Sequence, residues 1–302
     1  MADTVSPATG RRYGAERVCK VWGLPRSSYY AARRVEDGQP APRSKGRRGP
    51  KPGVSDADLL AAIRADLKRS PWSGEGHRKV WARLRVLDGL RAARKRVLRL
   101  MRENGLLSPH RARLRSDEEH DRRIITDAPD IMWAIDGTQI RTVTDGNVCL
   151  FAVAEHWNAE ALGWSVHKRG THRQALDAIS MAVQQQFGHL GKDAARGIKL
   201  RHDHGSCFLA DEFDRQVKAW GLTPSYAFVG QPETNGVIER FFKTLKEQVV
   251  YGRIFQNIEE VRTAVRDFIA RYNAEWLIEK NGYLSPHAMR EKWNLDQMPM
   301  AA

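Results

Sequence analysis

Residues 131–229 constrain the fold of this chain most strongly, because extended and helical patterns follow one another there in a readable order. Three runs rich in β-branched and aromatic residues come first, and TDGN at 144–147 indicates a turn between the first two. Helical and extended patterns then alternate, at 173–187, 197–203, 209–221 and 223–229. This order predicts an α/β domain with a mixed five-stranded sheet and helices on its faces.

Two further helices are expected after the sheet. One runs from about Glu233 to Val250, with an apolar stripe made of Ile238, Phe241, Phe242, Leu245 and Val249. The other spans 257–276 and precedes a C-terminal tail.

The positive charge of the chain is concentrated in its first part. Residues 1–128 contain 30 Lys and Arg against 15 Asp and Glu, while residues 129–302 contain 20 against 21. A basic front region on a near-neutral body is typical of a module that binds a polyanion, since each neutralised phosphate releases counterions. Charge that served solubility alone would be spread more evenly.

The front region contains helical patterns. Within 14–34 two short stretches flank Gly23, and Ser27 is placed to cap the second; a helix-turn-helix and an ordinary helical hairpin fit about equally well. Residues 35–53, rich in Pro, Gly and basic residues, are typical of a linker that can follow DNA.

Residues 54–108 are expected to be helical as well. Ser55 can cap a helix with the apolar stripe Leu59, Leu60, Ile63 and Leu67. A later helix ends at Gly105, and its basic residues form a face suited to DNA or to solvent: Arg94, Lys95, Arg96 and Arg99. The charged stretch 108–130 is expected to connect these helices to the sheet.

Cysteine usage and hydropathy indicate the compartment. Cys19, Cys149 and Cys207 are too few and too far apart for a disulfide framework or a Cys-x-x-Cys metal site. No apolar stretch approaches the roughly 20 residues of a membrane helix, and no signal peptide is evident. We therefore expect a soluble protein of a reducing cytoplasm.

Three carboxylates stand at informative positions. Asp136 lies inside the first predicted strand, where aspartate is disfavoured. Asp203 falls at the carboxyl end of a later strand, where open sheets gather their ligands. Glu239 lies on the long helix beside its apolar stripe, with Asn235 one turn before it and Lys246 two turns after it on the same face.

The order of these carboxylates resembles that of the retroviral-integrase superfamily: 35 residues separate Asp203 from Glu239, and Lys246 follows seven positions later. The resemblance is specifically to insertion-sequence transposases, as second-frame proteins of two-frame elements. It rests on the strings WAIDGTQI, LGWSV, HDHGSCF and NGVIERFFKTLKEQ, and on RRYGAERVCKVWGLPRSSYY, RVLRLMRENGL and YNAEWLIEKNGYLSP toward the ends. It covers essentially the whole chain.

This resemblance implies a ribonuclease H-like core and metal-dependent cleavage and transfer of DNA strands. It implies two Mg²⁺ or Mn²⁺ ions, with Asp136 bridging both, Asp203 holding one and Glu239 the other. The expected parts are a helix-turn-helix-like segment with its linker, a helical DNA-binding domain, the catalytic core, and a C-terminal helix with its tail: 1–53, 54–128, 129–254 and 255–302.

The expected partners are the inverted repeats at the element ends, target DNA, further copies of the chain, and a first-frame protein as fusion or partner, in a bacterial cytoplasm at the nucleoid. Lys246 is expected to pair with a phosphate, Asn235 to orient Glu239 or contact DNA, and His204 to touch a phosphate. Further candidate DNA contacts lie in the front region: Arg26, Ser27, Arg78, Lys79, Arg94 and Lys95.

Alternatives remain at this stage. A zinc site at His202 and His204 is disfavoured, because these residues alternate to opposite faces of a continuing strand and no cysteine pair accompanies them. A DNA-binding regulator with an inactive site and a nuclease without strand transfer are the competing functions. Glu155, His156 and the string AEWLIEK depart from the pattern usual in relatives, which puts the subgroup and some DNA contacts in doubt.

Overall fold

The computed structural model describes residues 2–37, 53–108, 125–226 and 235–297. The chain divides into two compact units, Met1–Gly53 and Val54–Ala302. The expected helix start near Glu233 and most of the stretches 35–53 and 108–130 lie outside the described residues. Every described helix is too short or too polar to cross a bilayer.

The first unit contains two helices, α1 (Gly14–Val21) and α2 (Arg26–Glu36). The prediction that Ser27 caps the second helix is wrong, because α2 already begins one residue earlier. The backbone N–H of Tyr29 donates to the carbonyl of Pro25, which opens the helix instead. Proline suits this place, since its missing N–H would have no partner within the helix anyway.

Three helices follow in the second unit, α3 (Asp56–Arg69), α4 (His77–Val86) and α5 (Arg94–Glu103), and they share a small apolar core. The predicted cap is confirmed: the Ser55 hydroxyl accepts a hydrogen bond from the N–H of Asp58 at 3.1 Å. The predicted stop is confirmed as well, since Gly105 follows α5 with a φ of +65°.

A buried ion triad inside these helices was not predicted. Arg83 donates to both oxygens of Asp66, at 2.8 and 2.9 Å, and also to Glu75. All three side chains are buried. The guanidinium therefore has two carboxylates as permanent partners.

One five-stranded sheet forms the centre of the second unit. Its strands lie in the order β3-β2-β1-β4-β5; the first three along the chain are antiparallel, and β4 and β5 continue parallel to β1. The strands span Met132–Arg141, Asn147–Glu155, Ala161–His167, Lys199–His202 and Thr223–Tyr226, respectively from β1 to β5. The predicted mixed, ribonuclease H-like sheet is confirmed.

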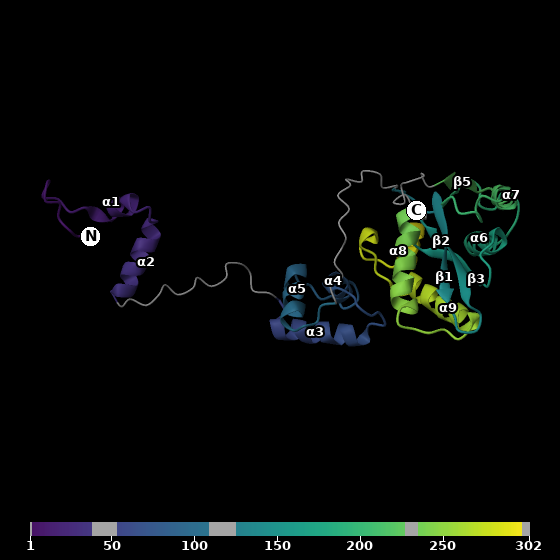
Figure 1. Ribbon diagram of the computed structural model, residues 1–302, viewed down its shortest axis with the longest axis horizontal. Coiled ribbons are helices and arrows are strands. Elements are labelled where there is room, and N and C mark those ends of the chain that lie inside the picture. Colours follow the sequence, from purple (N-terminus) through teal and green to yellow (C-terminus); the bar gives the residue numbers. More distant parts are fainter. Residues whose placement is uncertain (1, 38–52, 109–124, 227–234, 298–302) are drawn as a thin grey trace, which may run out of the picture. The chain divides into compact units, whose positions relative to one another are not determined.

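Helices cover both faces of this sheet (Figure 1). On one face lie α6 (His172–Phe187) and α7 (Asp211–Ala219). On the other lie α8 (Gly236–Leu245), which continues as a π-helical turn, and α9 (Ile258–Glu275). Gly163 of β3 lets α6 approach, because a Cβ there would lie 2.2 Å from a helix carbonyl oxygen.

The C-terminal region contains more structure than the expected tail. A short 3₁₀ turn, Glu279–Asn281, is followed by α10 (Pro286–Gln297). Arg290 of α10 pairs with Asp130 at 3.0 Å and with Glu155 at 3.5 Å. Ion pairs thus anchor a helix that has only one buried residue.

The α3–α5 helices contact the sheet domain through aromatic side chains and an amide. Trp72 meets Phe268 and Trp276 edge to face, with ring centroids 6.1 and 5.0 Å apart. The side chain of Gln248, on the π-turn, accepts from the N–H of Ser73 at 3.0 Å and donates to its carbonyl at 2.9 Å. The π-turn is therefore tied directly to these helices.

Candidate active site

Asp136 lies on the face of β1 that α8 covers. Side chains alternate along a strand, and Ala134 and Ile140 of β1 pack in the same apolar cluster as Phe241 of α8. Asp136 shares their parity, so its carboxylate points to that face. Its Oδ1 accepts a hydrogen bond of 2.7 Å from the N–H of Gly137.

Asp203 follows β4 directly, at the level of Asp136. The parallel pairing of β1 and β4 reaches Ala134 opposite Arg201, and two more residues on each strand bring the two aspartates side by side. The Oδ1 of Asp203 accepts from the N–H of Gly205 at 2.8 Å, which fixes the turn after the strand.

Glu239 is placed by the first turn of α8. The apolar stripe predicted for this helix is buried: Ile238, Phe241, Phe242 and Leu245. This packing fixes the helix rotation and leaves Glu239 exposed beside the stripe. Lys246 begins the π-turn that extends α8.

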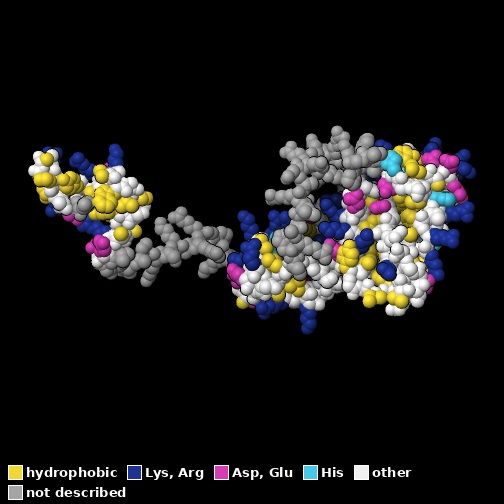
Figure 2. Space-filling view, viewed as in Figure 1, with side chains coloured by type: hydrophobic (Ala, Val, Ile, Leu, Met, Phe, Trp, Pro, Cys, Tyr) yellow, Lys and Arg dark blue, Asp and Glu magenta, His cyan; other side chains and the backbone are white. Residues whose placement is uncertain are grey.

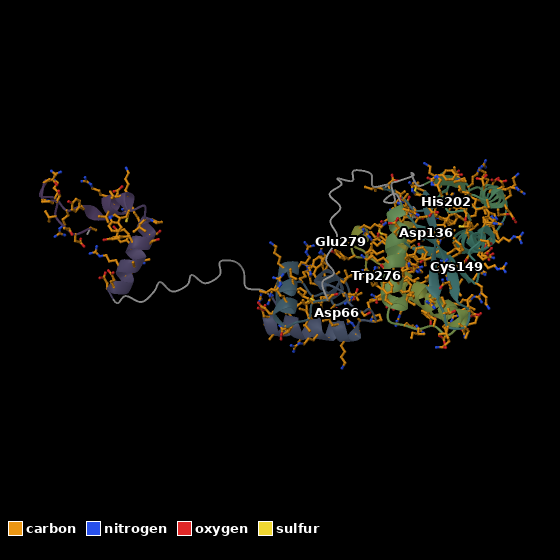
Figure 3. The ribbon with its side chains drawn as sticks, viewed as in Figure 1. Asp66, Asp136, Cys149, His202, Trp276 and Glu279 are labelled. Atoms are coloured by element: carbon orange, nitrogen blue, oxygen red, sulfur yellow. The ribbon has the colours of Figure 1, made fainter. Side chains whose placement is uncertain are left out.

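The electrostatics of Asp136 link these groups. Burial and the negative charges of Asp203 and Glu239 together raise the pKa of its carboxyl to about 6, although the Gly137 N–H and the Lys246 ammonium lower it. Figure 3 shows Asp136 close to His202, and Figure 2 shows several acidic side chains, in magenta, on the upper part of the visible face of this unit. The charges of Asp203, Glu239 and Lys246 thus all act on the Asp136 carboxyl.

The donor set fits a hard divalent cation. Oxygen atoms are the ligands that Mg²⁺ and Mn²⁺ prefer, and a cation relieves the repulsion among carboxylates that raises the pKa of Asp136. Within the described part of the chain, however, no three His, Cys, Asp or Glu side chains stand close enough together to form a metal site. The other carboxylates are near enough to affect the pKa of Asp136, but in the described structure they do not form a compact set of metal ligands.

Comparisons with known proteins agree with the predicted fold and with the predicted transposase function. The Integrase core domain family matches residues 126–232 and, through a second profile of that name, 220–286, while the HTH-like domain family matches 55–113. Transposase InsD for insertion element IS2A/D/F/H/I/K of Escherichia coli is 28% identical over 255 residues, which cover 82% of this chain and 81% of that protein. Together the two Integrase core domain matches span 126–286, more than half of the chain, so the chain carries an integrase core domain and is similar to insertion-sequence transposases.

Other matches are more distant or partial. An uncharacterized 48.2 kDa protein of insertion element IS2A from Escherichia coli is also 28% identical, but this transposase spans only 57% of its length. The catalytic core domain of HTLV-2 integrase in complex with magnesium is 15% identical, covering 53% of this chain and 96% of that chain with a TM-score of 0.38. The catalytic core domain of BIV integrase is 18% identical, covering 56% and 99% with a TM-score of 0.39.

The other residues expected near the transposase site have distinct surroundings. Asn235 occupies the N-cap position of α8, but its side chain makes no capping hydrogen bond. The residue is buried, and its Oδ1 has no hydrogen-bond partner in the described structure. The ring of His204 stacks on Tyr226 with centroids 5.6 Å apart. His202 is buried and its Nδ1 lies 2.8 Å from the Asp203 carbonyl oxygen.

Two expected DNA contacts in the helical part face the sheet domain instead. Lys79 donates to the carbonyl of Leu277 and lies 3.8 Å from the centroid of the Trp276 ring. Burial lowers the pKa of this lysine to about 8. Arg78 pairs with Glu279 at 3.3 Å. The placement of Lys79 argues against a direct contact with DNA. Arg78 is still exposed, but its guanidinium already pairs with Glu279.

The remaining basic candidates are more open. Arg94, Lys95, Arg26 and Ser27 are exposed, and Arg26 has only a long ion pair of 3.9 Å with a glutamate. On α5, in contrast, Arg96 and Arg99 both pair with Asp56 at 2.5–2.6 Å. The basic face of α5 is therefore narrower than the sequence suggested.

The departures from the usual transposase pattern turn out to be structural. Glu155 is fully buried, accepts from the N–H groups of Asp130 and Trp157, and faces Arg290. Lys280, in the string AEWLIEK, donates to the carbonyl of His156 at 2.9 Å. No local sequence pattern marks the pairing of Glu155 with Arg290 or of His156 with Lys280, because these partners are more than 100 positions apart.

Proposed function

We propose that this transposase cleaves a DNA strand at each end of its element and joins the freed 3′-hydroxyl to a second DNA site, using two Mg²⁺ or Mn²⁺ ions. Such ions, when bound, activate the attacking hydroxyl and stabilise the leaving oxygen. We assign Asp136 to both ions, Asp203 to one and Glu239 to the other. The supporting observation is that the charges of all three carboxylates meet at Asp136.

Each residue of the site has a defined task in this proposal. Asp136 is mostly ionised at neutral pH, since its pKa is about 6, and so it can bind cations without losing much to protonation. Lys246, at the start of the π-turn that extends α8, lowers the pKa of Asp136 through its positive charge. We assign this ammonium group to a DNA phosphate. Asn235 and His204 would contact the strand beside the carboxylates.

The proposed function also implies binding partners for the chain. We expect the helical segment 54–108 to bind the inverted repeats, through exposed residues such as Arg94 and Lys95. We expect several copies of the chain to assemble on DNA and a first-frame protein to supply further helices, at the bacterial nucleoid.

The deciding experiment measures cleavage and strand transfer on duplexes that carry the element ends, with Mg²⁺, Mn²⁺ or Ca²⁺. Asp136→Asn is compared with Asp267→Asn, which makes the same change at an exposed site on α9. We expect metal-dependent cleavage and joining in the wild type and in the control, and neither in Asp136→Asn. Cleavage without joining would indicate a nuclease, and binding without either would indicate a regulator.

A further inference from the structure

Arg201 carries a buried positive charge without an acidic partner. Its side chain is on β4, the residue is only 3% exposed, and its Nε and Nη2 have no hydrogen-bond partner in the described structure. Its Nη1 donates to the hydroxyl of Ser225 at 3.3 Å. Burial lowers the pKa of the guanidinium, and no described carboxylate raises it.

The other buried guanidiniums of the second unit show how unusual this is. Arg83 is enclosed by Asp66 and Glu75, and Arg290 has three carboxylates around it. A buried cation without such partners is strongly unfavourable, because it has lost water and gained no counter-charge. Among the described residues, Arg201 therefore has no anion that balances its charge.

The position of Arg201 indicates which anion this is. It stands opposite Ala134 on the sheet face that carries Asp136, two residues before Asp203, which is about 6.6 Å along the strand. Burial, together with the positive charges of Lys280 and Arg201, lowers the pKa of the nearby His156 to about 4. A positive site thus borders the carboxylates on one face.

We propose that Arg201 binds a backbone phosphate of the DNA strand, one or two nucleotides from the phosphate held at the carboxylates. This inference rests on the proposed function, since it takes the substrate to be DNA. The guanidinium fork matches the geometry of a phosphate. Among the described residues, β4 is separated from the edge of the sheet by the short β5, whose Thr223 and Tyr226 are exposed.

The test combines the melting temperatures of variants with strand-transfer assays on DNA in which single phosphates are neutralised. Arg201→Met should raise the melting temperature of the DNA-free protein, because it removes an unpaired buried charge, and should lower strand transfer about 10- to 100-fold, the value of a charged hydrogen bond. Ser225→Asp should act in the same direction, because it supplies an internal anion at the hydroxyl that Arg201 already contacts. Arg266→Met, on an exposed α9 site, is the matched control.

A series of end duplexes, each with one neutral methylphosphonate, locates the phosphate. We expect one position near the cleavage site to weaken wild-type binding in Ca²⁺ and transfer in Mg²⁺, but to have no further effect on Arg201→Met. Additive losses at every position would overturn the proposal. So would a destabilised or unfolded Arg201→Met, or a Ser225→Asp protein that is more stable and fully active, since Arg201 would then have only a structural role. DNA binding in Ca²⁺ measures the contact between Arg201 and the phosphate even if no strand transfer occurs. A failure of the proposed strand-transfer function can therefore be told apart from a failure of the Arg201 proposal.

Discussion

Two groups of three carboxylates lie in the sheet domain, and they differ in what balances their charge. The closed group is Asp130, Glu155 and Glu160, all paired with Arg290 of α10. The open group is Asp136, Asp203 and Glu239, where the cation acting on Asp136 is Lys246, whose influence on that pKa is smaller than the influences of the other two carboxylates.

A raised pKa alone does not distinguish these groups. Burial raises the pKa of Glu155 as it raises that of Asp136, and neighbouring carboxylates add to both shifts. The difference is the guanidinium: Arg290 is built into the closed group and holds α10 in place, whereas we propose that the open group binds cations from outside. The comparison teaches that charge balance, more than titration, separates a structural carboxylate group from a candidate metal site.

The largest effect should come from removing one charge in each group. Glu239→Gln should lower metal-dependent strand transfer by at least about 1,000-fold, equivalent to about 4 kcal/mol, because it removes a proposed metal ligand. Glu160→Gln should change transfer by less than about threefold, since its carboxylate balances Arg290 away from the reacting atoms. Rates from single-turnover assays decide this, and equal losses in both variants would refute the distinction.

The next effect concerns stability. Arg290→Met leaves three carboxylates of the closed group without their cation, and we expect a loss of about 3–5 kcal/mol in the free energy of unfolding at pH 7. The loss should shrink at pH 5, because the raised pKa of Glu155 lets that carboxyl take up a proton. Urea denaturation at the two pH values measures this, with Arg266→Met as the exposed control. A loss that does not depend on pH would mean that packing, not charge, anchors α10.

A smaller effect is expected from pH at the open group. The pKa of Asp136 is raised in the folded state, to about 6, so its contribution to stability is present below its usual pKa of about 4 and is lost as pH rises through 6. Cations compete with the proton, so Mg²⁺ should bind about tenfold more weakly for each pH unit below 6.

Thermal melting with and without Mg²⁺ measures this competition. We expect a clear upward shift of the melting temperature at pH 7.5, a small one at pH 5.5, and none in Asp136→Asn at either pH. Metal-free Asp136→Asn should also melt higher than the wild type at pH 7.5. An equal Mg²⁺ shift in wild type and variant would place the ion elsewhere.

The sequence predicted what depends on periodicity. The alternation along β1 and the apolar stripe of α8 were both readable, and these two features alone aim Asp136 and Glu239 at the same face. The ending of β4 before Asp203 was readable for the same reason. Most of the open group could therefore be predicted.

What the sequence did not predict depends on partners far away in the chain. Asp66 was overlooked because its partner Arg83 lies on another helix. Lys79 looked like an exposed basic residue, but Trp276, almost 200 positions later, covers it. α10 was missed because ion pairs to Arg290, rather than an apolar stripe, hold it. Periodicity carries no information about such contacts.

The smallest expected effect tests whether the open group depends on the helical part. Gln248 lies on the π-turn that follows the helix of Glu239, and its amide bonds both backbone groups of Ser73. Gln248→Ala removes these two backbone hydrogen bonds, at about 1 kcal/mol each, and a longer one of 3.4 Å from the Ser73 hydroxyl, so the free energy of unfolding should fall by about 1–2 kcal/mol. Strand transfer should fall a few-fold while binding of end DNA stays unchanged, because the carboxylate helix loses its tie to the helices proposed to bind DNA. Gln185→Ala, on the exposed side of α6, controls for loss of an amide. If Gln248→Ala lost stability but transferred strands at the wild-type rate, the contact would only hold the two parts together, and the open group would work independently of the helical part.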